Sequence, residues 1–131
     1  MDAIYIANEV LRRTGLSYQR LDSLCRAGVV EPSVKGATGK GSRRVYNEDD
    51  VKALLIGERL RVAGLSAAAI RHVLSGLRRT RNLTGSTCVV TDGRGVTCLE
   101  EQDLGQYLQN SKGAWVSVFR VGDVCGMAVT G

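Results

Sequence analysis

The tripeptide Gly15-Leu16-Ser17 separates two short amphipathic segments near the beginning of the chain. In the first, residues 7–13, Val10 and Leu11 fall on one helical face, and Gly15 is typical of a residue that ends a helix. Ser17 is a preferred helix N-cap. After it, residues with the i, i+3, i+4, i+7 spacing of one helical face are Leu21, Leu24, Cys25 and Gly28. The pattern predicts two helices packed across a tight turn, which is a helix-turn-helix.

The second helix of this pair is expected to present a polar outer face. At 100° per residue, Gln19, Ser23 and Arg26 point away from the apolar side, and Arg20 and Asp22 lie on the flanks. The second helix of a helix-turn-helix enters the DNA major groove. The candidate DNA-contacting residues here are therefore Ser17, Tyr18, Gln19, Arg20, Ser23 and Arg26.

Three of these positions leave alternatives open. Tyr18 either packs on the first helix or touches DNA, since an aromatic ring with a polar tip suits both places. Gln19 either bonds an adenine through its amide or is an ordinary solvated side chain. Asp22 would repel phosphates unless it accepts a hydrogen bond from a cytosine amine or pairs with a neighbouring arginine.

A glycine-rich basic segment follows the second helix. Pro32, the only proline, ends helical continuation and begins an extended stretch. Residues 35–44, the wing segment, contain three glycines, which allow a tight hairpin, and four basic residues suited to phosphates. We expect DNA-backbone contacts from Lys35, Lys40, Arg43, Arg44 and Tyr46, with Arg44 and Tyr46 the strongest candidates. A solvated loop is the alternative.

Two more helices are predicted to complete this part of the chain. Asn47 can cap a third helix, with Asp50 three residues later in a capping-box position. Gly64-Leu65-Ser66 ends that helix and caps a fourth. The expected buried stripe of the fourth helix consists of Ala69, Ile70, Val73, Leu74 and Leu77.

The composition changes around residues 77–86, which divides the chain into two predicted domains, residues 1–82 and 83–131. Beyond the change, β-prone runs flank Asp92-Gly93-Arg94-Gly95, which indicates a hairpin. We expect a helix over residues 100–110 and strands over residues 114–121 and 124–129. The predicted fold is α+β: a winged helix-turn-helix with an extra helix pair, then a small ββαβ-type unit. We expect Tyr107 and Trp115 to fill the core of this unit, with a ligand pocket or a dimer interface as the alternatives.

Charge is distributed unevenly between the two parts. The whole chain carries a net charge of +5. Residues 1–82 contain 15 Lys and Arg against 8 Asp and Glu (+7), whereas residues 83–131 contain 3 against 5 (−2). Positive potential is therefore concentrated where DNA contact is expected, because phosphate neutralisation supplies sequence-independent affinity. The tail, residues 83–131, is expected to have another role.

The remaining reactive side chains do not form a pattern typical of catalysis. Cys25 lies on the core side of its helix, and we expect Cys88, Cys98 and Cys125 to be small packing residues, with a thiolate metal site or redox switch as the alternative. His72 is the only histidine. We predict no enzyme activity, no metal and no cofactor. Without an export signal or an apolar run of membrane-spanning length, a cytoplasmic, nucleoid-associated protein is expected.

Taken in order, these motifs resemble the DNA-binding domain of the MerR family of bacterial transcription regulators. The resemblance covers roughly residues 5–77. It rests on Arg13-Thr14-Gly15-Leu16-Ser17, Gly28-Val29-Val30-Glu31-Pro32, Arg44-Val45-Tyr46-Asn47-Glu48-Asp49-Asp50-Val51 and Leu60-Arg61-Val62-Ala63-Gly64-Leu65-Ser66. It implies a sequence-specific regulator that binds double-stranded DNA, with RNA polymerase as a further partner.

Two departures from the family pattern shape the functional prediction. Asp22-Ser23-Leu24 stands where the family usually has an arginine and two aromatics, so base preference is not carried over. The long fifth helix through which family members dimerise is replaced by β-prone sequence, so we expect the tail, residues 83–131, to be a dimerisation or effector module, with a homodimer formed through it. Two alternatives remain: an excisionase-like architectural protein that bends DNA, and a protein-interaction adaptor whose basic face is incidental.

Overall fold

The structure, a computed structural model, describes residues 4–30, 44–79, 83–112 and 115–125 of the 131-residue chain. In chain order its elements are β1 (Ile4–Ile6), α1 (Ala7–Thr14), α2 (Tyr18–Arg26), β2 (Val45–Asn47), α3 (Glu48–Val62), α4 (Ala67–Arg79), β3 (Thr87–Thr91), β4 (Val96–Glu100), the 3-10 turn η1 (Glu101–Asp103), α5 (Leu104–Asn110), β5 (Ser117–Arg120) and α6 (Val121–Cys125). This mixture of helices with two small antiparallel sheets confirms the predicted α+β class.

The turn between α1 and α2 has the local structure that the sequence predicts. Gly15 ends α1 in the left-handed region, at φ 75°, and its N–H donates to the Leu11 carbonyl over 2.9 Å. The Ser17 side chain accepts a hydrogen bond of 3.1 Å from the Arg20 N–H and so caps α2. Both motifs act within a few residues, which is why they could be recognised from the sequence.

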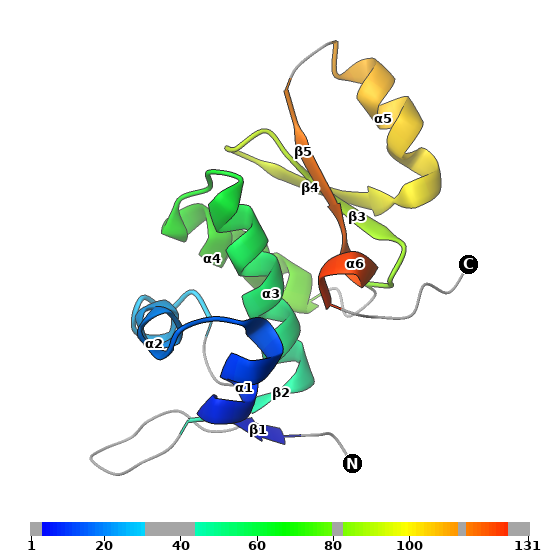
Figure 1. Ribbon diagram of the computed structural model, residues 1–131. Helices are drawn as coiled ribbons and strands as arrows, with labels where there is room; N and C mark the ends of the chain where they lie inside the picture. Colours follow the sequence, from blue (N-terminus) through cyan, green and yellow to red (C-terminus); the bar gives the residue numbers. More distant parts are fainter. Residues whose placement is uncertain (1–3, 31–43, 80–82, 113–114, 126–131) are drawn as a thin grey trace.

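Helix α3 is the centre of the fold, and helices α1, α4 and α6 pack around it (Figure 1). Its predicted capping box is present: the Asp50 N–H donates to Asn47 Oδ1 at 2.9 Å, and the Asn47 N–H donates to Asp50 Oδ2 at 3.0 Å. Gly57 allows α4 to approach closely, because an added Cβ would lie 3.3 Å from Leu74 Cδ1. A helix covered on several sides needs apolar residues around most of its circumference, as α3 has.

Strands β1 and β2 form a two-stranded antiparallel sheet that brings two distant segments together. Tyr5 pairs with Tyr46, and Ile6 pairs with Val45. Residues 4–6 thereby lie beside the point at which the chain enters α3. The predicted wing segment lies, apart from Arg44, outside the described residues.

The tail contains a three-stranded antiparallel sheet with the order β4-β3-β5. The hairpin turn, residues 92–95, has four residues, and Val89 therefore lies opposite Cys98. Every residue of the central strand β3 is buried. The sheet lies between α3 and α5 (Figure 1), and α6 joins its last strand to α3.

The buried core continues from the helices into the tail. Val89 of β3 and Val121 of α6 are both fully buried and belong to the same apolar cluster as Leu54 and Leu60 of α3. This continuity gives the tail a packing surface on the helical part, as expected for a small unit of marginal stability. The division into two domains at residue 82 stays a prediction.

Two expectations for the tail were wrong, and one expected strand is present but shorter. Val124 belongs to the helix α6, not to a last strand, and residues 126–131 of that expected strand lie outside the described part of the chain. Of the strand expected over residues 114–121, the described part (residues 115–121) contains β5, Ser117–Arg120. Trp115 is 95% exposed and does not fill the core. No helix in the described ranges has both the length and the hydropathy needed to cross a membrane.

Candidate nucleic-acid interface

The outer face of α2 is open to solvent. Leu21 and Leu24 are buried against the rest of the fold, and the opposite side of the helix is therefore turned outward. Most of the residues predicted to contact DNA from this helix are exposed: Ser17, Tyr18, Gln19, Ser23 and Arg26. Tyr18 is 59% exposed, so its ring does not fill the core. Their contact with DNA stays a prediction.

Asp22 lies between two arginines on this surface. Arg26 Nε donates to Asp22 Oδ2 at 2.7 Å, and Arg44 Nη1 donates to Asp22 Oδ1 at 2.8 Å. The hydrogen bond from Arg44, followed by that from Arg26, lowers the pKa of Asp22. Of the alternatives for Asp22, pairing with neighbouring arginines is thus the one present in the structure.

Arg20, on the flank of α2, is partly buried and faces α3. Its Nε lies 3.4 Å from Glu58 Oε2, and Glu58 also accepts a 3.0 Å hydrogen bond from Arg61 Nε. Arg61, and then Arg20, lowers the pKa of Glu58. Arg20 therefore connects α2 to α3 as well as being a candidate for DNA contact.

Tyr46 requires a correction, because its side chain is in the core. The residue is fully buried, and its hydroxyl lies 3.4 Å from Cys25 Sγ. Burial raises the pKa of Tyr46. The predicted contact between Tyr46 and a phosphate is wrong for this conformation, because the ring has no accessible surface. Cys25, expected to pack, is half-buried against the core.

A polar cluster that the sequence did not indicate connects α1, the first helix of the helix-turn-helix, to α3. Arg13 forms two hydrogen bonds to Glu48, of 2.8 and 3.1 Å, and the Tyr5 hydroxyl donates to Glu48 Oε2 at 2.7 Å. The Arg13 guanidinium also lies 5.3 Å from the Tyr5 ring centroid. The hydrogen bonds from Arg13 lower the pKa of Glu48 to about 2.

Among the described residues, one further basic side chain, Arg71, lies beside the candidate surface. Lys35, Lys40 and Arg43, predicted as phosphate contacts, lie outside the described residues. On α4, Arg71 is exposed and its Nη1 lies 3.5 Å from the Ala27 carbonyl, beside the end of α2. The sequence did not indicate Arg71, because the residue is far from α2 along the chain and only folding brings them together.

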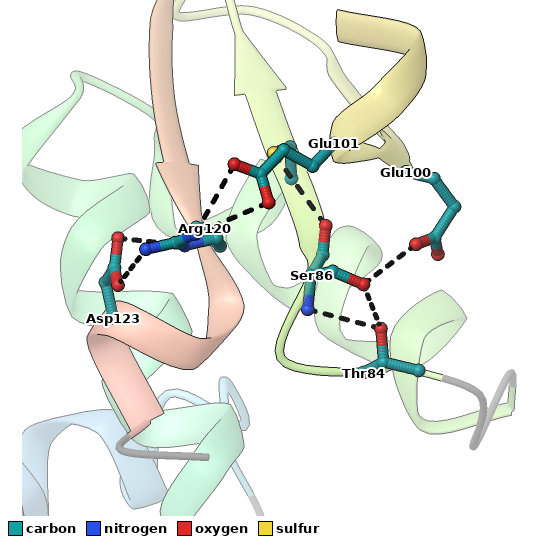
Figure 2. A network of polar contacts seen from close by, with 7 residues as sticks. Thr84, Ser86, Glu100, Glu101, Arg120 and Asp123 are labelled. Atoms are coloured by element: carbon teal, nitrogen blue, oxygen red, sulfur yellow. Dashed lines mark hydrogen bonds and ion pairs between the residues drawn. The ribbon is translucent and has the colours of Figure 1, made fainter. Parts of the chain in front are cut away.

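A network of polar contacts connects the elements of the tail near α6 (Figure 2). Arg120 donates to both oxygens of Asp123, at 2.9 and 3.2 Å, and reaches Glu101 at 3.4 Å. Nearby, the Ser86 hydroxyl donates to Glu100 at 3.1 Å and lies 2.9 Å from the Thr84 hydroxyl. These contacts join β5 to η1, and the segment before β3 to β4.

The cysteines of the tail do not converge. Cys88 is buried, Cys98 is exposed, and Cys125 is half-buried. Burial raises the pKa of the Cys88 thiol, which favours the protonated, unreactive form. Within the described ranges, no group of three or more His, Cys, Asp and Glu side chains is arranged to hold a metal ion.

Comparison with known proteins connects this geometry to a family. Residues 5–77 match the profile described as MerR HTH family regulatory protein, which is more than half of the chain. Proteins from Mycobacterium bovis and Mycobacterium tuberculosis, each named an uncharacterized HTH-type transcriptional regulator, are 32% identical over 120 residues. The alignments cover 89% of this chain and therefore include part of the tail. The chain spans about half the length of these curated relatives, 48%.

Proposed function

Because the chain belongs to the MerR family of helix-turn-helix regulatory proteins, we propose that it is a sequence-specific transcriptional regulator that binds duplex DNA with α2 in the major groove. The observation that carries the proposal is the exposed polar face of α2, opposite the buried Leu21 and Leu24. A capped helix held by its apolar side projects its other side toward a groove.

Base contacts are assigned to the middle of this face. Gln19 can form two hydrogen bonds with an adenine, and the Ser23 hydroxyl can donate to or accept from several bases. Ser17 and Tyr18, at the start of α2, are suited to phosphates, because the N-terminus of a helix attracts anions.

Backbone contacts are assigned to the basic residues around α2. Arg20, Arg26 and Arg44 belong to this set, together with the wing residues Lys35, Lys40 and Arg43. The charge of +7 over residues 1–82 supports the assignment. Tyr46 is no longer a candidate, since it is buried.

The tail is proposed to form a homodimer interface. Trp115, just before β5, is 95% exposed, and Val118, within β5, is 40% exposed. Leu108 of α5 is 40% exposed as well. Exposed large apolar side chains of this kind are typical of interaction surfaces. RNA polymerase is a further proposed partner, and the proposed place of action is the nucleoid in the cytoplasm.

The proposal is tested by selecting duplex fragments from a genomic library with the purified protein and footprinting the enriched site. We expect a discrete footprint and an affinity that falls steeply with salt concentration. Gln19→Ala should change the base preference, whereas Gln106→Ala, at an exposed position of α5, should not.

Other outcomes would identify the alternative functions. Cooperative coating and bending of repeated half-sites, without an effect on transcription, would favour an excisionase-like architectural protein. Failure to retain any duplex, with salt-insensitive binding to a protein partner, would refute DNA binding and favour an adaptor.

A further inference from the structure

Asp22 is an acidic residue within the surface that faces DNA in the proposed function. Its two carboxylate oxygens accept hydrogen bonds from different arginines, Oδ2 from Arg26 and Oδ1 from Arg44. Both distances, 2.7 and 2.8 Å, are those of strong charge-assisted hydrogen bonds. Asp22 therefore pairs with two guanidinium groups. Without Asp22, both groups would be available to bind phosphates.

The two arginines reach Asp22 from different parts of the chain. Arg26 lies in the last turn of α2, four residues after Asp22, whereas Arg44 is 22 residues away, next to β2 at the end of the wing segment. Asp22 thus connects α2 to Arg44, the described residue of the wing segment.

The two arginines are restrained to different degrees. The Arg44 side chain is 19% exposed and the Asp22 side chain 24% exposed, so this pair is partly shielded from water. The Arg26 side chain is 75% exposed, so its pair with Asp22 is open to water. Partial burial weakens screening by salt, and the Arg44 pair should therefore persist at physiological ionic strength.

We propose that Asp22 is a positioning residue that sets DNA specificity by holding Arg26 and Arg44 at the junction of α2 and the wing segment. An arginine compensated by a carboxylate contributes little to counterion release, so Asp22 weakens attraction to DNA of unrelated sequence. At the correct site, guanidinium groups that are already in place make their contacts without rearrangement. The inference rests on the proposed function, DNA binding through α2.

The experiment compares wild type with Asp22→Asn, which keeps the shape of the side chain and removes its charge. Asp22→Glu keeps the charge. Asp123→Asn is the matched control, because it changes net charge equally by neutralising a carboxylate that pairs with an arginine in the tail. Each folded variant is titrated, from 50 to 200 mM salt, with the selected duplex and with a random-sequence duplex of equal length.

For Asp22→Asn, we expect the slope of log affinity against log salt on the random duplex to steepen by about 0.9 to 1.8, as for one or two additional phosphate contacts. Affinity for that duplex should rise by about three- to tenfold at low salt, and the ratio of selected to random affinity should fall at least about threefold. Asp22→Glu and Asp123→Asn should retain the wild-type slope.

Three results would overturn the inference. One is an unchanged slope for Asp22→Asn, the second is an equal change on both duplexes, and the third is an Asp22→Glu variant that behaves like Asp22→Asn. If wild type binds duplex DNA and any of these results is observed, the inference about Asp22 is refuted and the proposed function stands. If wild type binds no duplex, the proposed function fails, and the inference fails with it.

Discussion

Val89→Ala tests whether the tail and the helix-turn-helix part are stabilised by one core. Val89 lies in the central strand of the tail, is fully buried, and shares an apolar cluster with residues of α3. The substitution removes two methyl groups, each worth about 0.8 kcal/mol of transfer free energy. The space left behind increases the loss, so the free energy of unfolding should fall by about 2 kcal/mol.

The assay is urea unfolding followed by circular dichroism at 222 nm, together with amide hydrogen exchange of α3. With a denaturant dependence of about 2 kcal/mol per molar, the midpoint should fall by about 1 M. Exchange in α3 should accelerate although the substitution is in the tail. Val118→Ala, at a position 40% exposed in the neighbouring strand, is the control and should cost less than about 1 kcal/mol.

The reasoning is refuted if Val89→Ala leaves the unfolding midpoint and the exchange of α3 unchanged while the sheet alone exchanges faster. That result would mean that the two parts unfold independently, and that contact between them contributes little to the stability of the helices.

Three further predictions concern a cap, an ion pair and the proposed dimer. Ser17→Ala should lower the free energy of unfolding by about 1 kcal/mol through loss of the α2 cap, whereas Ser75→Ala, at an exposed position within α4, should not destabilise. Because the pKa of Glu48 is lowered to about 2, its stabilisation is complete above the ordinary value of 4.5 and is lost as pH falls toward 2. The free energies of unfolding of wild type and Glu48→Gln should therefore differ by at most about 1 kcal/mol at pH 7, since the Arg13 and Glu48 side chains are 38% and 40% exposed. The two values should converge in acid. A difference that stays constant with pH would contradict this prediction. Trp115→Ser should weaken self-association in analytical ultracentrifugation without changing monomer stability, and Val62→Ser, 71% exposed, should affect neither; equal association of all three proteins would exclude Trp115 from the interface.

The features predicted correctly from the sequence are those determined by neighbouring residues. Gly15 and Ser17 end one helix and begin the next through contacts that span four residues or fewer, and the Asn47–Asp50 capping box spans three. Such motifs have the same meaning in most folds, so the helix boundaries of the first half follow from them. The hairpin around residues 92–95 was also predicted from its turn residues, whereas the register of β3 and β4 became known only from the structure.

The features that could not be predicted depend on contacts between distant segments. Arg13 and Glu48 are 35 residues apart, and Asp22 and Arg44 are 22 apart; nothing in either local sequence specifies these pairs. Tyr46 was expected at the surface because it follows a basic segment, but its strand pairs with β1 and turns the ring inward. Local β propensity also misidentified Val124, whose short helix packs on α3.

The central position of α3 has a practical consequence for anyone who would shorten this protein. A fragment that stops at residue 82 ends close to the family match, but it lacks Val89 and Val121, which belong to the same buried core as α3. Apolar surface uncovered in this way promotes aggregation, and the fragment would be a poor reagent for crystallisation or NMR. A soluble DNA-binding piece should extend at least through Cys125.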